Sequence, residues 1–473
     1  MTLRVALLPL LTAWTIACGP AEVSRADDDA EEPYIPPGAT EETVVVNQSR
    51  AAQGSCSFDV EYELSPSINT VGVVRWSSSF EEPTAAHLEF ALPESEQRWV
   101  APADLGTDEH RTLLLGMKAE RRYDFRIVVS NDDAECVSRD FPITTGELPN
   151  SIPRITREVH HADRVEPGFI VTSTGVGNLF GGSGGDPVFI LDSEGDVVWY
   201  WLDTPPQTSR AHMDWAGSRM WMLALNVTGG AGEVSYVSMD GSEHVTDVAG
   251  LEETHHDFTV LPDGTVTAIA HIGNCSGIIE RSPDGTTKTI VETVASIYKP
   301  GQAVYVTVGG VECHPNSIHY HPEDDSYTLS DRYVHAYVKI SRSGELLWQL
   351  GGHDPLGPSF HAVWAVNHGH QLLDNGNFLL FSNGNAGETA RVLEYELDES
   401  TWEAKRIWEY DGDRTSPTLG DVQRLPGGNT LVTYSNSGVI QEINDDGDVV
   451  QEIKTTSLGY TNFRSSLYGA PPR

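Results

Sequence analysis

Hydrophobic and polar residues alternate in three short segments of the first third of the chain: residues 71–76, 87–90 and 123–129. Alternation with a period of two over this length predicts half-buried β-strands. Trp76 lies in the first segment and is a candidate core residue, whereas Tyr123 opens the last segment. We therefore expect a small β-sandwich domain over residues 54–147.

A second pattern begins after Pro149 and repeats along the rest of the chain. Two apolar runs joined by a polar turn recur six times, at residues 188–199, 234–241, 277–285, 338–348, 392–408 and 439–447. The turn glycines Gly195, Gly241, Gly285 and Gly344 are 46, 44 and 59 residues apart. This period is typical of the four-stranded blades of a β-propeller.

Another type of turn lies between these hairpins, at residues 261–264, 373–376 and 425–428. Each ends in a glycine, which supplies the positive φ that a tight hairpin turn needs. A β-helix or a double sandwich does not explain two interleaved families of turns. We therefore predict an all-β protein in which a six-bladed β-propeller, residues 150–473, follows the β-sandwich.

The N-terminus has the features of an export signal. Arg4 precedes an apolar run that is too short to span a membrane, and small Ala17 stands before Cys18. Residues 15–18 resemble the lipobox of bacterial lipoproteins, which implies a signal peptide at residues 1–17 and a lipid on Cys18 that anchors the protein to a membrane. Ordinary secretory cleavage nearby is the alternative. Both predict an exported protein, and the lipobox places it in the periplasm or at the outer membrane or cell surface of a bacterium.

Residues 18–53 are rich in Asp, Glu and Pro and have few large apolar side chains. Such a segment cannot bury a core, so we expect an extended acidic linker. The strands of residues 54–147 resemble a fibronectin type III or immunoglobulin-like domain. We expect this domain to be a spacer, with carbohydrate binding as the alternative.

Charge and cysteine content narrow the classes of function. The 69 Asp and Glu outnumber the 30 Lys and Arg, and the net charge of −39 argues against nucleic acid as a partner. Without Cys18, four of the 5 cysteines remain, an even number that suits disulfides in an oxidising compartment. Three pairings are possible. We predict Cys56–Cys136 and Cys275–Cys313, because each pair falls within one predicted domain.

Histidines are the candidate functional residues of the propeller. His256, His314 with Asn316, and His368 each precede a predicted strand, so equivalent positions in successive blades point to one shared channel. His255 is the other candidate for the inward position, and His370 is a candidate helper of His368. His319 and His321 alternate on a strand but lack an evident third ligand, so we predict no metal.

Taken together, these motifs resemble the bacterial arylsulfotransferase family. The segments that carry the resemblance are residues 255–264, 314–317, 329–332, 348–352, 368–377 and 381–384. The resemblance implies a six-bladed propeller that moves a sulfuryl group from a phenolic sulfate ester to a phenol, without a cofactor or a nucleotide sulfate donor. It also implies a sulfohistidine intermediate on His368, with His256, His314, Asn316 and Arg332 around the sulfuryl group.

The chemistry of these residue types fits such roles. A neutral imidazole is a nucleophile and exchanges protons near neutral pH, and a guanidinium is a permanent cation for sulfuryl oxygens. Asn367 and Ser382 depart from the residues usual in the family, which are Gln and Asp. A surface binding or adhesion propeller that has lost the chemistry is therefore the second hypothesis. A quinone-dependent dehydrogenase ranks third, because such propellers usually have eight blades.

Overall fold

The computed structural model describes residues 47–53, 56–93, 95–107, 109–175, 185–225, 231–272, 275–298, 313–352 and 355–472. These residues form β-strands and three short 3₁₀ helices, which confirms the all-β prediction. None of their helices is long and apolar enough to cross a membrane. The predicted signal peptide, residues 1–17, and the predicted lipid anchor at Cys18 lie outside the described residues.

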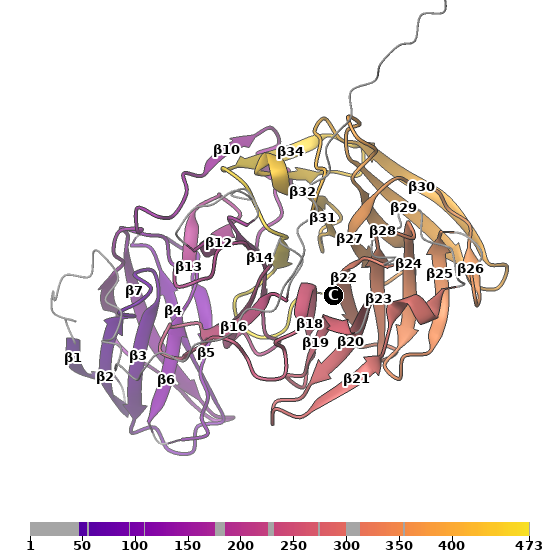
Figure 1. Cartoon of the computed structure of the whole chain (residues 1–473). Coiled ribbons are helices and arrows are strands. Elements are labelled where there is room, and N and C mark those ends of the chain that lie inside the picture. Colours follow the sequence, from indigo (N-terminus) through magenta and orange to yellow (C-terminus); the bar gives the residue numbers. More distant parts are fainter. Residues whose placement is uncertain are drawn as a thin grey trace, which may run out of the picture. The chain divides into compact units, whose positions relative to one another are not determined.

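Two sheets are formed before residue 145 (Figure 1). One contains β1 (Asn47–Gln53), β2 (Cys56–Leu64), β3 (Gly72–Ser78) and β6 (His110–Leu114). The other contains β4 (Ala85–Ala91), β5 (Trp99–Pro102), β7 (Arg122–Ser130), β8 (Glu135–Val137) and β9 (Phe141–Thr144). Both sheets contribute to one buried cluster that includes Trp76 and Tyr123, because apolar residues alternate along their strands. The backbone of residues 47–53 pairs with β2, so the predicted linker reaches into the first sheet.

After residue 145 the described residues form six further sheets, which follow one another along the chain. The first two are β35 (Asn462–Arg464) with β11 (Phe169–Ser173), β12 (Val188–Asp192) and β13 (Val197–Trp201), and then β14 (Thr208–Met213), β15 (Arg219–Ala224), β16 (Glu233–Ser238) and β17 (His244–Val245). The third is β18 (Thr254–Val260), β19 (Val266–Ile272), β20 (Cys275–Arg281) and β21 (Thr287–Val291).

The fourth sheet is β22 (Pro315–His321), β23 (Ser326–Asp331), β24 (Ala336–Ser341), β25 (Leu346–Gly351) and β26 (Ser359–Phe360). The fifth is β27 (Asn367–Leu372), β28 (Phe378–Ser382), β29 (Arg391–Asp398) and β30 (Glu403–Asp411). The sixth is β31 (Asp421–Arg424), β32 (Thr430–Tyr434), β33 (Val439–Ile443), β34 (Val449–Lys454) and β10 (Thr156–Val159). This is the order of sheets that the sequence repeats predict for propeller blades.

The turns between strands agree with both predicted families. In the turn from β18 to β19, Gly264 has φ 81° and its N–H donates to the carbonyl of Leu261 at 2.9 Å. Gly376 has φ 84° in the matching turn from β27 to β28. The turn from β22 to β23 carries no glycine, and Asp325 adopts φ 51° there instead. Aspartate tolerates this region better than most residues, which explains why the repeat was not visible at this point of the sequence.

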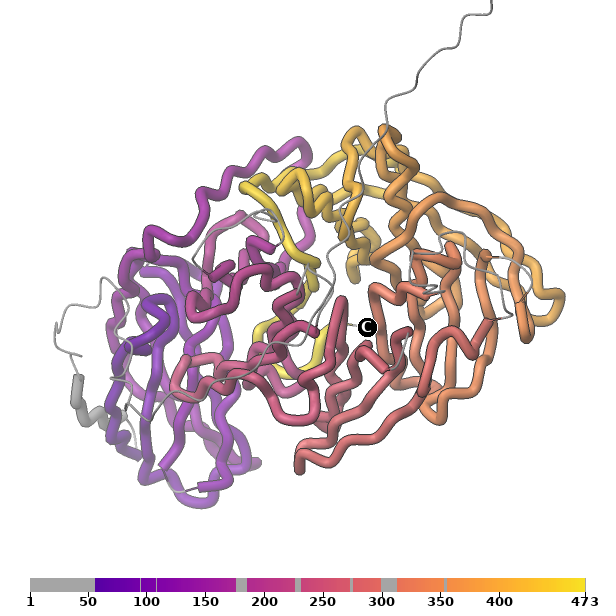
Figure 2. Tube along the Cα trace, viewed as in Figure 1, coloured from indigo at the N-terminus to yellow at the C-terminus, as the bar shows by residue number. Residues whose placement is uncertain are grey.

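Both ends of the repeat region pair with distant sheets. The N-terminal strand β10 pairs with β34, and the C-terminal strand β35 pairs with β11. Figure 2 shows the yellow C-terminal segment running beside the magenta strands of the early repeat region. The first and sixth sheets are therefore each completed by a strand from the other end of this region.

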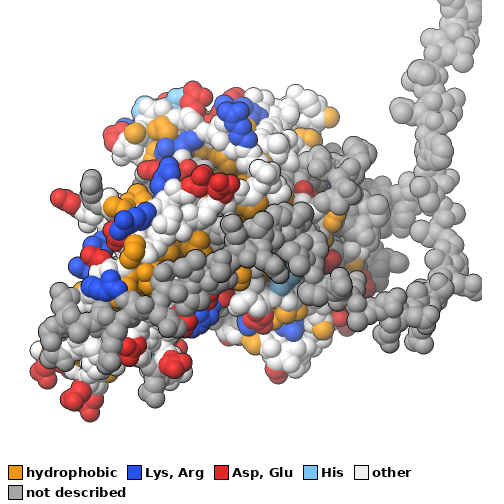
Figure 3. Space-filling model, turned by 90° about the vertical axis from the view of Figure 1, so that its left-hand side faces the viewer, with side chains coloured by type: hydrophobic (Ala, Val, Ile, Leu, Met, Phe, Trp, Pro, Cys, Tyr) orange, Lys and Arg blue, Asp and Glu red, His pale blue; other side chains and the backbone are white. Residues whose placement is uncertain are grey.

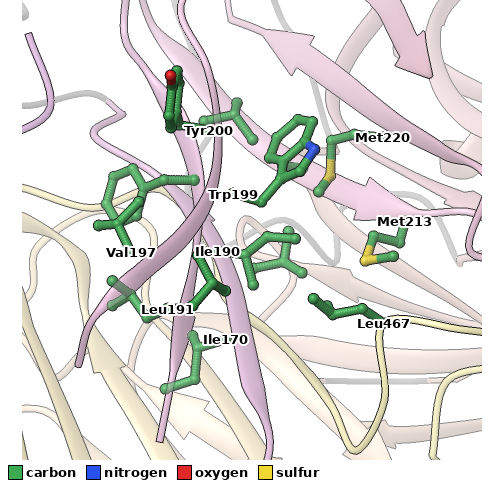
Figure 4. Packing of buried hydrophobic residues seen from close by; sticks show 14 of the residues in the cluster. Ile170, Ile190, Leu191, Val197, Trp199, Tyr200, Met213, Met220 and Leu467 are labelled. Atoms are coloured by element: carbon green, nitrogen blue, oxygen red, sulfur yellow. The ribbon is translucent and has the colours of Figure 1, made fainter. Parts of the chain in front are cut away.

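The largest buried cluster lies around the first two of these sheets (Figure 4). Trp199 and Tyr200 are fully buried among apolar side chains such as Ile190 and Met220. The polar atoms of the large rings are satisfied, because Trp199 Nε1 donates to the carbonyl of Met239 and Tyr200 Oη accepts from the N–H of Asn69. The second bond comes from the loop between β2 and β3, so the N-terminal sheets pack on this cluster.

Charged side chains of both signs lie beside one another on the face drawn in Figure 3. Several exposed ion pairs occur in the described residues, among them Arg391–Asp411 and Arg406–Glu409. Such pairs each contribute about 0 to 1 kcal/mol, so the stability of the fold depends on the buried sheets instead.

We expect removal of residues 460–473 to unfold the repeat region, because β11 loses its partner β35 and the buried Tyr460 is lost. The thermal unfolding midpoint should fall by at least about 10 °C, measured by circular dichroism. Removal of residues 470–473 alone, which spares β35, is the control and should change the midpoint little. Equal midpoints for the two truncations contradict the closure by β35.

Candidate active site

The predicted site residues lie where the first strands of successive sheets lose their regular pairing. The register shifts between Thr254 and Phe258 in β18, between Pro315 and Ser317 in β22, and between Asn367 and His370 in β27. Neighbouring first strands contact one another, β18 with β22 and β22 with β27. A β-bulge changes the direction in which its side chains point. His256, Asn316 and His368 each fall within one of these shifts.

A buried arginine connects these first strands. Arg210 of β14 donates from Nε and Nη2 to both carboxylate oxygens of Asp257, at 2.7 and 2.8 Å, and from Nη1 to Asp421 at 3.0 Å. Its guanidinium carbon lies 3.9 Å from the ring centre of Tyr460. Burial opposes the charge, but the two carboxylates outweigh it and raise the pKa of Arg210 above its usual value. This contact joins three sheets and the C-terminal segment.

His368 is buried and its tautomer is determined by Asn383. The amide nitrogen of Asn383 donates to the carbonyls of Ser416 and Leu419, at 2.5 and 2.7 Å, so its oxygen faces His368 Nδ1 at 2.6 Å. Nδ1 must therefore carry the proton, which leaves the lone pair on Nε2. Burial, together with Arg332 and His256, lowers the pKa of His368 to about 3 although Asn383 opposes the shift. The ring is therefore neutral at neutral pH, with a lone pair on Nε2.

His256, His314 and Arg332 lie close to His368. The rings of His256 and His314 are 4.6 Å apart between centres, and Tyr333 packs on His314 at 4.7 Å. The N–H of Arg332 donates to the carbonyl of His314 at 3.0 Å. Burial is the main cause of the lowered pKa values, and Arg332 lowers those of all three histidines further. The structure therefore brings the predicted imidazoles and guanidinium together.

Arg332 has no carboxylate partner among the described residues. Its Nε is buried and forms no hydrogen bond to any of them. A half-buried guanidinium whose buried Nε lacks a partner among these residues favours an anion beside the imidazoles. The buried side-chain oxygen of Asn316 also has no partner in this part of the chain, while its nitrogen donates to the carbonyl of Asn367 at 2.8 Å.

His255 contacts the ring of His256, whereas His370 contacts two hydroxyl groups. His255 is buried behind His256, with 2.6 Å between the two Nδ1 atoms. His370 has both ring nitrogens within hydrogen-bond distance of hydroxyls, Nδ1 at 2.9 Å from Ser317 and Nε2 at 2.8 Å from Thr328. Both ring nitrogens of His370 therefore have partners on β22 and β23.

A cavity of about 170 Å³ lies further along the same first strands. His319, His321 and His370 line it together with His212 and the C-terminal residues around Pro472. In the described residues, the group whose ligand atoms lie close enough for a metal is Asp192, Glu194 and Asp196, and Lys118 already pairs with all three. The histidines of the cavity do not form such a group.

The disulfide Cys275–Cys313 lies next to the candidate site, and the predicted pairing is confirmed for both disulfides. Ser276, directly after Cys275, has its hydroxyl 2.9 Å from His255 Nε2. The residue after Cys313 is His314. The disulfide therefore links the backbone next to Ser276 to the backbone next to His314.

Four supporting residues were not predicted from the sequence: Arg210, Asp421, Asn383 and Ser276. Asn383 stands in the motif at residues 381–384, so a search for an orienting partner of His368 could have found it. Arg210 has no motif around it. Its role depends on carboxylates 47 and 211 residues away, and no local pattern shows such contacts.

Comparisons with known proteins agree with part of this interpretation. Residues 312–456 match the family model described as Arylsulfotransferase (ASST). No curated protein matches the chain significantly. Similar solved structures include a periplasmic gluconolactonase of Pseudomonas aeruginosa, 14% identical, covering 65% of this chain and all of that one, with a TM-score of 0.40. TolB from Acinetobacter baumannii is 8% identical, covering 74% and 80%, with a TM-score of 0.42.

We expect Arg210→Met to destabilise the protein by about 3 to 5 kcal/mol, because Asp257 and Asp421 are then buried without a counter-ion. Urea unfolding followed by tryptophan fluorescence measures this loss. The control is Arg391→Met, whose half-exposed ion pairs contribute about 0 to 1 kcal/mol. Similar losses in the two variants contradict the central role of Arg210.

Stability should fall as the pH falls from 6.5 to about 4. Burial lowers the folded-state pKa of His256 and His321 to about 4 and of His370 to about 3, whereas an unfolded histidine titrates near about 6.5. In this window the unfolded chain binds protons that the folded chain does not. His321→Gln should reduce the slope by up to about 1.4 kcal/mol per pH unit, measured by urea unfolding at several pH values. Exposed His361→Gln is the control, and parallel curves for wild type and His321→Gln contradict the assignment.

Proposed function

We propose that this protein is an aryl sulfotransferase that moves a sulfuryl group from a phenolic sulfate ester to a phenol through a sulfohistidine on His368. The observation that carries the proposal is the neutral, buried His368, whose Nδ1–H is donated to Asn383 and whose Nε2 forms no hydrogen bond with the residues that the structure describes. The match of residues 312–456 to the Arylsulfotransferase family supports the same reaction.

In the first half of the proposed reaction, His368 Nε2 attacks sulfur and the phenolate leaves. We propose that Arg332 and His314 hold the sulfuryl oxygens together with the second N–H of Asn316, whose other N–H donates to the carbonyl of Asn367. The guanidinium of Arg332 provides a positive charge for them in a protein of net charge −39. In the second half a phenol takes the sulfuryl group from His368, so one histidine serves both halves.

The proposal extends to where the protein works. Two disulfides fit an oxidising compartment. We propose that the chain is exported, that Cys18 carries a lipid, and that the six sheets of the repeat region are the blades of a propeller held away from the membrane by the acidic segment and the N-terminal sheets. The reaction needs no cofactor.

Incubation of the purified full-length protein with 4-nitrophenyl sulfate and excess phenol should release nitrophenol. Intact-mass analysis at mildly alkaline pH, without acceptor, should show one added sulfuryl group, and peptide mapping should place it on His368. His368→Ala should lower turnover by at least about a thousandfold, because the nucleophile is lost. Exposed His361→Ala is the matched control and should leave turnover unchanged.

Undiminished turnover in His368→Ala removes the proposed mechanism. Absence of nitrophenol release and of an adduct over a panel of aryl sulfates, combined with retained binding of such esters, supports the alternative of a non-catalytic binding propeller.

A further inference from the structure

His256 has a left-handed backbone conformation, and its ring contacts the ring of His255. His256 has φ 61°, the left-handed region that residues with a Cβ rarely adopt. Strain of this kind clusters at functional sites and persists only where surrounding contacts maintain it. Asp257, the next residue, is held by Arg210, and His255, the preceding one, is buried. The two neighbours thus hold His256 between them.

The side chain of His256 makes its contact with His255 through Nδ1. The 2.6 Å between the two Nδ1 atoms means that the rings share one proton. His255 Nε2 lies 2.9 Å from the hydroxyl of Ser276, which can donate or accept. His271 stacks on the other side of His255 with 4.1 Å between ring centres. With Nδ1 occupied, Nε2 is the nitrogen of His256 that is left for a substrate.

We propose that His255 is a positioning residue for His256, and that the pair, anchored by Ser276, accepts and returns the proton of the phenol in the two halves of sulfuryl transfer. This inference rests on the proposed function. The titratable and charged groups around the pair are His271, His314, Arg332 and His368.

The His255–His256 pair moves one proton in each half of the proposed transfer. When the anionic ester binds, the neutral pair takes up one proton and carries it on His256 Nε2. His368 Nε2 attacks sulfur, the bond from sulfur to the phenol oxygen breaks, and the phenolate receives the proton from His256. The pair is then neutral, with the shared proton on His256 Nδ1 and His255 Nε2–H donated to Ser276. The incoming phenol returns a proton to His256 Nε2 as its oxygen attacks sulfur, and the electron pair of the N–S bond returns to His368.

An imidazole orients His256 at a lower electrostatic cost than a carboxylate would. A carboxylate also orients an imidazole, but it adds a negative charge beside an anionic ester. His255 keeps the ring of His256 in one orientation and accepts its Nδ1–H without that charge. Burial lowers the pKa of His255 to about 2, so it stays neutral and remains an acceptor.

The test compares two donors in the full-length protein. Phenol, with a pKa of about 10, needs a proton when it leaves, whereas nitrophenol is a much better leaving group. His255→Phe retains a ring next to His271 but removes both nitrogens. We expect single-turnover phenol release from phenyl sulfate to fall by about 100-fold, and nitrophenol release from 4-nitrophenyl sulfate by less than about threefold. Ser276→Ala, which retains both imidazoles, should show the same preference with about a tenfold loss for phenyl sulfate.

An equal loss with both donors in both variants overturns the positioning role, because a merely structural defect does not depend on the leaving group. The control is His321→Gln in the cavity further along the strands, which should affect neither donor. Thermal unfolding of each variant verifies that it is folded.

A second readout does not depend on activity. The proton between two Nδ1 atoms should give a far-downfield proton resonance in the wild-type protein, absent in His255→Phe and retained in His321→Gln. A wild-type protein that shows this resonance but transfers no sulfuryl group overturns the proposed function and leaves the pair itself intact. Transfer without the resonance overturns the pair alone.

Discussion

The ion pair of Arg210 with Asp257 and Asp421 is the contact on which the arrangement of the first strands depends. All three side chains are buried, so removing one leaves an uncompensated charge in a low-dielectric environment. Asp257 also accepts the N–H of Ile318 at 3.0 Å, which adds β22 to the strands held by this contact. Gly369 shows how closely the strands approach, because a Cβ there would lie 2.1 Å from an Asp421 carboxylate oxygen. His256 and His368 each stand one residue from this network, so their positions follow from it.

Desolvation sets the protonation of the site. Burial is the largest cause of the lowered pKa of His256, His314 and His368, and Arg332 acts in the same direction. The guanidinium of Arg332, beside these three neutral imidazoles, makes a local positive field inside a strongly acidic protein. An anion is then attracted to this point by short-range contacts, while the net charge repels it at long range. The same burial that keeps His368 neutral also makes the fold sensitive to acid.

Much of the architecture could be predicted from local patterns. Strand alternation located β3, β4 and β7, turn glycines located most hairpins, and the even number of cysteines with one pair per predicted domain gave both disulfides. The strand at residues 47–53 was not predicted, because its sequence lacks the apolar alternation that marks its neighbours. The sequence placed His256 and His368 just before strands, whereas the structure places them within β18 and β27; His314 does precede β22. Arg210 and Ser276 were not found, because their partners come from other sheets and a sequence of one chain does not show which sheets meet.

The two orienting contacts of the site use neutral acceptors. Asn383 accepts Nδ1–H of His368, and His255 shares the Nδ1 proton of His256. Many histidine nucleophiles and bases are oriented by a carboxylate, which stabilises the imidazolium form. Under the proposed function, a carboxylate here would place a second negative charge beside an anionic ester and would favour protonation of His368. Asn383 avoids both effects, because its amide dipole fixes the tautomer and leaves the lone pair of Nε2 available. Asn383, and not Ser382, is therefore the side chain of that motif that fixes the tautomer of His368.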